Sequence, residues 1–446
     1  MRRTRSLVSV ALTALVLAGC GGGGSPDAKE GDKGSATPSA ASPRPKGPSV
    51  LLTVPSGYDP KRGWQHTLDW MPEDYSAQPL VAVGTHSDTV AYVDTTEDGY
   101  VVQVRDASTG TVRFTSRPWA PPAPMEGNGL LEHSVELPSV TTTVQDGREY
   151  VVLWAHGETG RDALNKGKQS VRLLVFRADA SGGAVAPARE IDIPVDVLAL
   201  GRRHLQVADW GTGLEVHWES KNTEQKAVAV DVASGTLDRC ADACSQGIGR
   251  LRTDKGWVVS DYSQDSVSMP GGWDIRDAAP PGATYPRDEG SNSFVGVTGG
   301  RLLTRWGAES GTLTAVHDSD SGKLVTSVAC DDPRGTEAVA SPDGRFVAVG
   351  TVAFDLQQRN GFCLEAGEER KASVYIWSIA DGGTAFGTLD DTRYDNEQTA
   401  EVDLSTGTPR LLPEGTRVPD LTLKNTGVFL TPDKTGGLLI SALRTK

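Results

Sequence analysis

The stretch VQVRDASTGTVRF, residues 102–114, decides the fold class of this chain. On both sides of its centre, β-branched or aromatic residues alternate with polar ones, and this period of two is typical of a half-buried strand. At the centre, Asp106 is placed to accept a hydrogen bond from the backbone two residues further on, and Gly110 supplies the positive φ that closes a hairpin. The stretch therefore predicts two antiparallel strands joined by a tight turn.

The same pattern of strand and turn recurs through the chain. Strong copies of the turn run from Asp231 to Gly235, from Asp318 to Gly322 and from Asp403 to Gly407, and weaker copies end at Gly182 and Gly383. The turn glycines at 110, 182, 235 and 322 are separated by 72, 53 and 87 residues, and the longest gap predicts a degenerate unit around residues 256–262. Repetition on this scale predicts an all-β fold in which each unit buries its face against its neighbours.

Two groups of segments carry a family resemblance. VQVRDASTGTVRF and VAVDVASGTLDR (residues 228–239) resemble the repeat of PQQ-like β-propellers. ASPDGRFVAVG (residues 340–350), followed by VYIWSI (residues 374–379), resembles a WD-type blade, with SPDG as the turn between two strands and YIW in the third. The long loop expected at 355–371 is atypical of such a blade.

The resemblance implies a β-propeller over residues 50–446, with about seven four-stranded blades. Six or eight blades remain open, and an array of two-sheet sandwiches is the second architecture. Residues 50–54 and 436–443 both have strand patterns, and their pairing in one blade would close the ring and remove exposed edges. No cofactor or metal ligands of quinoprotein dehydrogenases are matched, so no cofactor and no metal are expected.

The first twenty residues predict export. Three arginines precede an apolar run from Leu7 to Leu17, which at 11 residues is too short to span a bilayer as a helix. LAGC at residues 17–20 resembles the lipobox of bacterial lipoproteins, which implies a signal peptide over residues 1–19 and a lipid on Cys20. Residues 20–49 are rich in Gly, Ser and Pro and predict a disordered tether. We therefore expect a lipid-anchored protein on the extracytoplasmic face of the cell membrane.

Charge and cysteine usage narrow the chemistry further. The formal net charge is −14, without a Lys/Arg cluster, so nucleic acid is not an expected partner. Apart from Cys20, the cysteines are Cys240, Cys244, Cys330 and Cys363, an even number that favours disulfides in an exported domain. Proximity favours Cys240–Cys244 and Cys330–Cys363 among the three possible connectivities.

No catalytic residue is identified. The chain has no HExxH zinc motif and no GxSxG nucleophile elbow. Trp119 lies in the proline-rich stretch PWAPPAP (residues 118–124), and this loop tryptophan is a candidate ligand-binding residue or a cover for the core. The sequence favours a non-catalytic binding protein for a protein or envelope ligand. A carbohydrate-active hydrolase or lyase using loop carboxylates, and an assembly scaffold for envelope proteins, are the alternatives.

Overall fold

A computed structural model provides the fold of the chain. It describes residues 47–71, 79–123, 137–160, 162, 164–165, 167–197, 205–222, 224–240, 244, 247–261, 266–284, 294–309, 311–330, 337–368, 370–389, 398–433 and 436–446. Within these ranges, no helix has the length and the apolarity that crossing a membrane requires.

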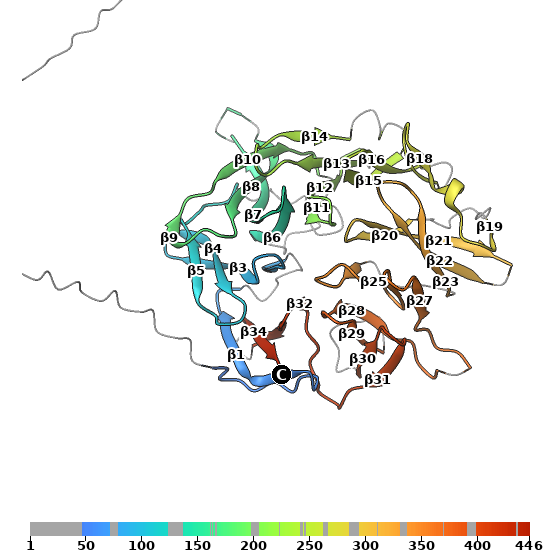
Figure 1. The fold of residues 1–446 in the computed structure, drawn as a ribbon. Helices are drawn as coiled ribbons and strands as arrows, with labels where there is room; N and C mark the ends of the chain where they lie inside the picture. Colours follow the sequence, from blue (N-terminus) through green and yellow to red (C-terminus); the bar gives the residue numbers. More distant parts are fainter. Residues whose placement is uncertain are drawn as a thin grey trace, which may run out of the picture. The chain divides into compact units, whose positions relative to one another are not determined.

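Eight sheets are arranged around a common centre as the blades of a propeller (Figure 1). Blade 1 consists of β2 (Val81–Gly84), β3 (Thr89–Thr96), β4 (Gly99–Asp106), β5 (Val112–Ser116) and β9 (Gly182–Val185), and blade 2 of β6 (Ser139–Gln145), β7 (Arg148–Thr159), β8 (Lys168–Arg177) and β10 (Arg189–Pro194). Blade 3 consists of β11 (Leu205–Asp209), β12 (Leu214–Glu219), β13 (Gln225–Val230) and β14 (Leu237–Arg239), and blade 4 of β15 (Gly247–Thr253), β16 (Gly256–Asp261), β17 (Val267–Met269) and β18 (Trp273–Asp274).

Blades 5 to 8 complete the ring. Blade 5 consists of β19 (Ala283–Thr284), β20 (Phe294–Thr298), β21 (Arg301–Ala308), β22 (Thr312–Asp318) and β23 (Leu324–Ala329), and blade 6 of β24 (Ala338–Ala340), β25 (Phe346–Val349), β26 (Val352–Asp355) and β27 (Asn360–Cys363). Blade 7 consists of β28 (Tyr375–Ile379), β29 (Thr384–Thr388), β30 (Thr399–Asp403) and β31 (Thr408–Leu411), and blade 8 of β32 (Leu421–Leu423), β33 (Thr426–Pro432), β34 (Leu438–Thr445) and β1 (Tyr58–Leu68). A short 3-10 helix, η1 (Ile275–Ala278), follows β18.

The predicted all-β propeller is confirmed, and the degenerate unit around residues 256–262 is blade 4. The expected number of about seven blades is wrong, because the ring has eight. The outer turn of blade 6 departs from the Asp–Gly pattern of the sequence. There Asp355 accepts the backbone N–H groups of Gln357 and Gln358 as in the other turns, but Arg359 takes the positive φ, +57°, in place of glycine.

The WD-like segment divides between two blades. SPDG forms the turn between β24 and β25, as predicted. The YIW segment was expected in the third strand of that blade, but it lies in β28, the first strand of blade 7. The stretch expected to be a long loop contains β27, the outermost strand of blade 6. Two expectations are therefore wrong: residues 355–371 are not one long loop, and the YIW segment is not the third strand of blade 6.

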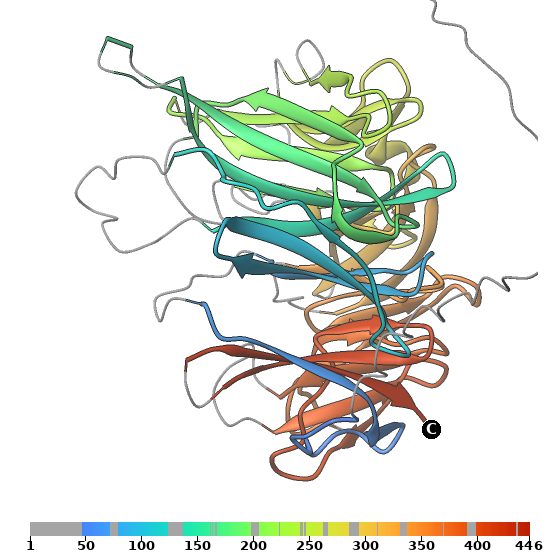
Figure 2. The same ribbon diagram turned by 90° about the vertical axis from the view of Figure 1, so that its left-hand side faces the viewer.

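The ring closes through strands from both ends of the described chain. β1 forms the outer strand of blade 8 and pairs with β34, with Trp64 opposite Ala442 (Figure 2, where blue β1 runs beside the red strand that ends at C). Closure is confirmed, but its first strand is not residues 50–54. Pro55 and the turn at 56–57 precede β1, and Val50 and Leu51 lie on the surface with 48% and 61% exposure.

Blade 4 lies further from the axis than its neighbours. Its first strand, β15, contacts β13, the third strand of blade 3, whereas the first strands of blades 1, 2 and 3 contact one another in series. Blades 3 and 5 meet directly across the gap: Gly300 N–H donates to the Trp210 carbonyl at 2.8 Å. A Cβ atom on Gly211 would lie 2.3 Å from the Gly300 nitrogen, so glycine is required for this contact. We call Trp210, Gly211, Gly299 and Gly300 the glycine clasp.

Candidate functional site

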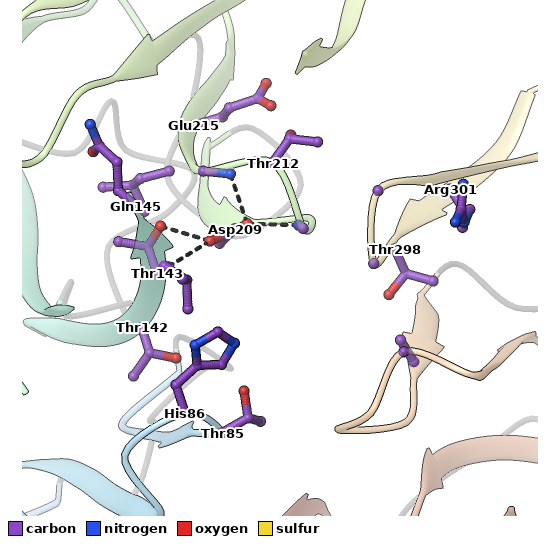
Figure 3. Close-up of a pocket in the computed structure, with 18 of the residues that line it drawn as sticks. Thr85, His86, Thr142, Thr143, Gln145, Asp209, Thr212, Glu215, Thr298 and Arg301 are labelled. Atoms are coloured by element: carbon purple, nitrogen blue, oxygen red, sulfur yellow. Dashed lines mark hydrogen bonds between the residues drawn. The ribbon is translucent and has the colours of Figure 1, made fainter. Parts of the chain in front are cut away.

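A cavity of about 1350 Å³ opens on one face of the ring. In an antiparallel blade, the turn between the first and second strands and the turn between the third and fourth strands lie at the same end, and we call this end the turn face. The lining comes from all eight blades, mostly from residues at or near these turns. Figure 3 shows Thr85, His86, Thr142 and Gln145 on one wall, with Arg301 and Thr298 across the opening.

Carboxylates dominate the charge of the lining. Among the described residues, eleven acidic ones line the cavity: Asp146, Glu149, Asp209, Glu215, Asp231, Asp238, Asp254, Asp318, Asp320, Asp343 and Asp420. Against them stand two arginines, Arg252 and Arg301, and His86. Both arginines are ion-paired within the lining, Arg252 with Asp238 at 2.5 Å and Arg301 with Asp318. The described part of the lining is therefore strongly negative, and both of its arginines are already paired.

Asp209 is saturated by hydrogen bonds. One carboxylate oxygen accepts from the Thr143 hydroxyl at 2.7 Å and from the Val144 N–H at 3.2 Å, both on β6 of the neighbouring blade. The other accepts the N–H groups of Gly211 at 2.6 Å and Gly213 at 3.1 Å (Figure 3). Charge-assisted bonds of this kind are about twice as strong as neutral ones. Asp209 thus holds blade 2, blade 3 and the glycine clasp together.

Glu149 of blade 2 links blades 1 and 2 in the same way, by accepting backbone hydrogen bonds from the neighbouring blade. It is only 9% exposed, and its two oxygens accept the backbone N–H groups of His86 at 3.1 Å and Ser87 at 2.8 Å. These amides belong to the first turn of blade 1, whose residues Thr85 and His86 line the cavity. A carboxylate bound in this way fixes the turn and has no free oxygen aimed at a substrate.

Glu215 is buried between blades 3 and 4. One oxygen accepts the backbone N–H of Arg252 at 2.8 Å, and the other lies 2.8 Å from Nε2 of His217. Burial raises the pKa of Glu215, and the neighbouring His217 opposes that shift. A carboxyl with a raised pKa is a possible general acid, but Glu215 is 1% exposed and both oxygens are occupied. It acts as a structural group at this position.

Three other carboxylates are free at the tips of the turns. Asp146, Asp254 and Asp320 belong to blades 2, 4 and 5, and within the described part of the chain their side chains make no hydrogen bond or ion pair. Lys255 approaches this region, but its Nζ donates to the backbone carbonyl of Asp320 at 3.4 Å. These three carboxylates are available to a ligand.

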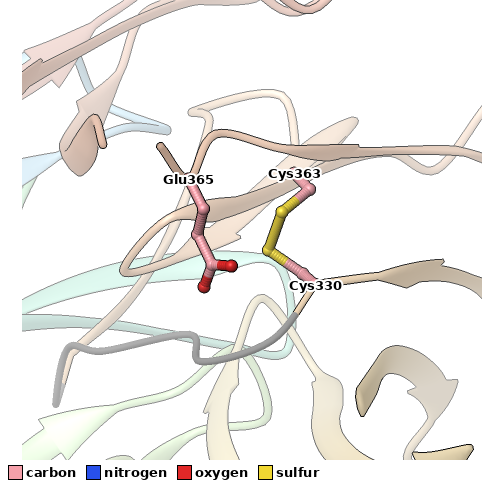
Figure 4. A group of neighbouring side chains, drawn as sticks. All are labelled: Cys330, Cys363 and Glu365. Carbon is pink, nitrogen blue, oxygen red and sulfur yellow. A yellow bond between two sulfur atoms is a disulfide. The ribbon is translucent and has the colours of Figure 1, made fainter. Parts of the chain in front are cut away.

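The structure contains both favoured disulfides. Cys240–Cys244 closes a short loop after β14, and Cys330–Cys363 joins the residue after β23 in blade 5 to the end of β27 in blade 6. Glu365 lies beside the second disulfide (Figure 4), and these three residues form a cluster of possible metal ligands. The sulfurs are bonded to each other, so thiolate ligands are not available there.

Trp119 and Cys20 were the other site residues expected from the sequence. The Trp119 backbone forms a two-bond bridge with Tyr100, at 2.8 and 3.0 Å, and its side chain packs on the core of blades 8, 1 and 2. It does not line the cavity. Its candidate role in binding stays a prediction, as does lipidation of Cys20, which lies outside the described residues.

None of the residues that build the cavity was expected at a functional site. Asp209 belongs to the stretch DWGTG (residues 209–213), in which two glycines surround a threonine directly after a strand. That pattern indicates a tight turn that needs glycine. The neighbouring residues do not indicate that Asp209 also accepts hydrogen bonds from β6, about 65 residues away in sequence. Such partners become visible only when the blades are assembled.

Comparisons with known proteins return structures but no family. No protein-family model and no curated protein matches the sequence. The Cps50 (Swd1) β-propeller domain of Myceliophteria thermophila is similar at 11% identity and a TM-score of 0.35, covering 82% of this chain and 95% of that one. An uncharacterized protein of Listeria monocytogenes EGD-e is similar at 9% identity and a TM-score of 0.38, covering 82% and 94%.

The Dos1 propeller is similar at 11% identity and a TM-score of 0.38, covering 86% of this chain and 94% of that one. The propeller assignment for this chain rests on its own eight sheets. Fold and site together define an eight-bladed β-propeller with an acidic cavity on its axis.

Proposed function

We propose that this protein is a lipid-anchored extracytoplasmic binding protein, whose propeller holds a protein or envelope ligand at the turn face without catalysis. The LAGC segment and the Gly/Ser/Pro-rich stretch that follows it support the anchor. The rigid ring with turns converging on one cavity supports binding, because such scaffolds position loops for recognition.

One observation carries the non-catalytic part of the proposal. The deep carboxylates Glu149, Asp209 and Glu215 are occupied by backbone N–H groups, a hydroxyl and an imidazole. A general acid or base has to reach the substrate with a free lone pair or proton. These three residues stabilise the cavity wall and are not available as a general acid or base.

The acidic cavity is also the observation that favours the second candidate, a carbohydrate-active hydrolase or lyase. That activity requires a pair of carboxylates about 5–9 Å apart on either side of a glycosidic bond. The free pair would have to come from the turn tips, for example Asp254 and Asp320. Release of reducing sugar from cell-wall polysaccharide by the wild type, and its loss in Asp254→Asn, would support the enzyme and contradict a passive wall.

Two experiments test the main proposal. Cys20→Ser is expected to abolish labelling by an alkyne analogue of palmitate and to move the protein from the membrane to the soluble fraction. Unchanged labelling and fractionation would contradict the anchor.

For binding, a photo-crosslinking amino acid replaces Thr212 in the cavity wall, or Glu97 on the turn between β3 and β4 at the opposite end of its blade. A discrete adduct from position 212 and none from position 97 is expected. Equal adducts from both positions would contradict a ligand held at the turn face. The identity of the crosslinked partner also distinguishes two functions: several envelope proteins would indicate an assembly scaffold, and one partner would indicate a binding protein.

A further inference from the structure

The cavity extends outward from the axis between blades 3, 4 and 5. Its lining includes Asp231 on the outer turn of blade 3, Asp238 on the following strand β14, Asp254 on blade 4, and Asp318 and Asp320 on blade 5. We call this part the acidic recess. It exists because blade 4 lies back from the axis and the glycine clasp bridges the gap that this leaves.

We propose that the acidic recess and the adjoining turn of Asp146 bind an extended polypeptide segment rich in lysine or arginine. This inference rests on the proposed binding function and names its partner class. The carboxylates are spread over several blades, so they match a ligand whose positive charges are also spread along its length. The arginines of the lining are already paired, so they do not compete for the free carboxylates.

The geometry separates this ligand from a metal ion. Hard divalent cations need several oxygen ligands converging within about 2.3–2.6 Å of one point. Within the described residues, the only cluster of three possible ligands within 4.8 Å is Cys330, Cys363 and Glu365, which lies outside the cavity. The recess therefore offers a diffuse negative field and no chelating site.

The lining also argues against a glycan as the ligand of the recess. Sugar sites present aromatic faces for stacking, and Trp377 of blade 7 is the one aromatic residue in the described lining. It belongs to the opposite side of the ring from blades 3 and 4, and its indole N–H donates to Thr388 at 3.0 Å. The volume of about 1350 Å³ exceeds the usual 300–1,000 Å³ of small-molecule pockets and suits a chain segment.

The test uses a fluorescein-labelled decalysine peptide and the folded protein without its lipid, with affinity measured by anisotropy at several salt concentrations. The variant Asp146→Asn, Asp254→Asn, Asp320→Asn removes three free carboxylates from the recess and its adjoining turn. Asparagine tolerates the positive φ of residue 146, +51°, so the turn is kept. The matched control Glu97→Gln, Asp98→Asn, Glu309→Gln removes the same charge from turns at the opposite end of the blades.

We expect wild type to bind decalysine, with affinity falling as salt rises because the charges are screened. The recess variant should lose about tenfold in affinity, which corresponds to about 1.4 kcal/mol, and the control less than about twofold. Equal losses in both variants would reduce the effect to net charge and overturn the proposal. Saturable Ca²⁺ binding that displaces decalysine would also overturn it.

Failure of this inference can be told apart from failure of the proposed function. Absence of decalysine binding by wild type overturns the cationic ligand alone. If the crosslinker at position 212 still captures a discrete partner, the propeller remains a binding protein with a ligand of other chemistry.

Discussion

Gly110 lies against the indole of Trp64: a Cβ atom on this glycine would come within 2.5 Å of the ring. Gly110 belongs to the outer turn of blade 1, and Trp64 to the outer strand of blade 8. The arrangement repeats at Gly322 against Trp273 and at Gly407 against Phe362. In these three turns the glycine therefore has two roles: it closes its own hairpin and it leaves room for an aromatic side chain of the preceding blade.

Gly110→Ala should destabilise the propeller more than the same change in an open turn. The φ of +71° costs about 1–2 kcal/mol for a residue with a Cβ, and the clash with Trp64 adds about 1–3 kcal/mol. Gly147→Ala is the control, because its φ is +69° and nothing lies within 4 Å. Urea unfolding measures both. Equal losses would mean that the indole moves aside freely.

Asp209→Ala should lower the free energy of unfolding by about 2–4 kcal/mol, because it removes the acceptor of partly buried N–H groups on two blades. Thr143→Val, which removes one donor and keeps the shape, should cost about 1 kcal/mol. Both values come from urea unfolding at neutral pH. A loss no larger than that of Thr143→Val would contradict the role of Asp209 as a tie between blades.

The stabilisation that ionised Asp106 gives the folded protein should be lost in acid. Burial alone would raise its pKa, but hydrogen bonds from Arg113, Ser108 and Thr109 together lower it to about 2. The folded pKa lies below the unfolded value of about 3.9. The stabilising contribution is therefore present above about pH 4 and is lost as the pH falls toward 2.

The measurement compares wild type with Asp106→Asn by urea unfolding between pH 7 and pH 2.5. The stability difference should be constant above about pH 4.5 and shrink below it. Asp98→Asn, on an exposed turn, is the control and should show no such trend. A difference between wild type and Asp106→Asn that grows in acid would reverse the expected sign.

The two disulfides should contribute unequally. Cys330–Cys363 closes a separation of 33 residues and Cys240–Cys244 one of 4, so loop entropy predicts about 4 and about 2 kcal/mol. The double variants Cys330→Ser, Cys363→Ser and Cys240→Ser, Cys244→Ser test this by thermal unfolding. A larger drop in Tm for the short loop would point to packing, since Gly249 lies against Cys240 and Cys244.

Turn residues and strand alternation, which are read within a few positions, were enough to predict the fold class. Contacts between blades, which join residues distant in sequence, could not be predicted. Asp106 and Gly110 revealed their turn because both requirements lie within five residues. The turn of Asp355 was overlooked because Arg359 adopts a conformation that favours glycine. The cavity was invisible because Asp209 and Glu149 have their partners on neighbouring blades. Strand alternation predicts hairpins and does not say which blades meet across a gap.

The closure of the ring has a consequence for how the domain is made. Gln65 of β1 and Ser441 of β34 are 376 positions apart, yet they lie within hydrogen-bonding distance. During synthesis, blades 1 to 7 have all their strands once β31 has emerged, whereas β1 has no partner until residues 438–445 emerge. Contacts so distant in sequence form slowly and leave intermediates exposed. Pairing of β1 with β34 is therefore the step that completes the ring. A chain cut before β34 leaves β1 unpaired, and the exposed strand edge is open to proteases.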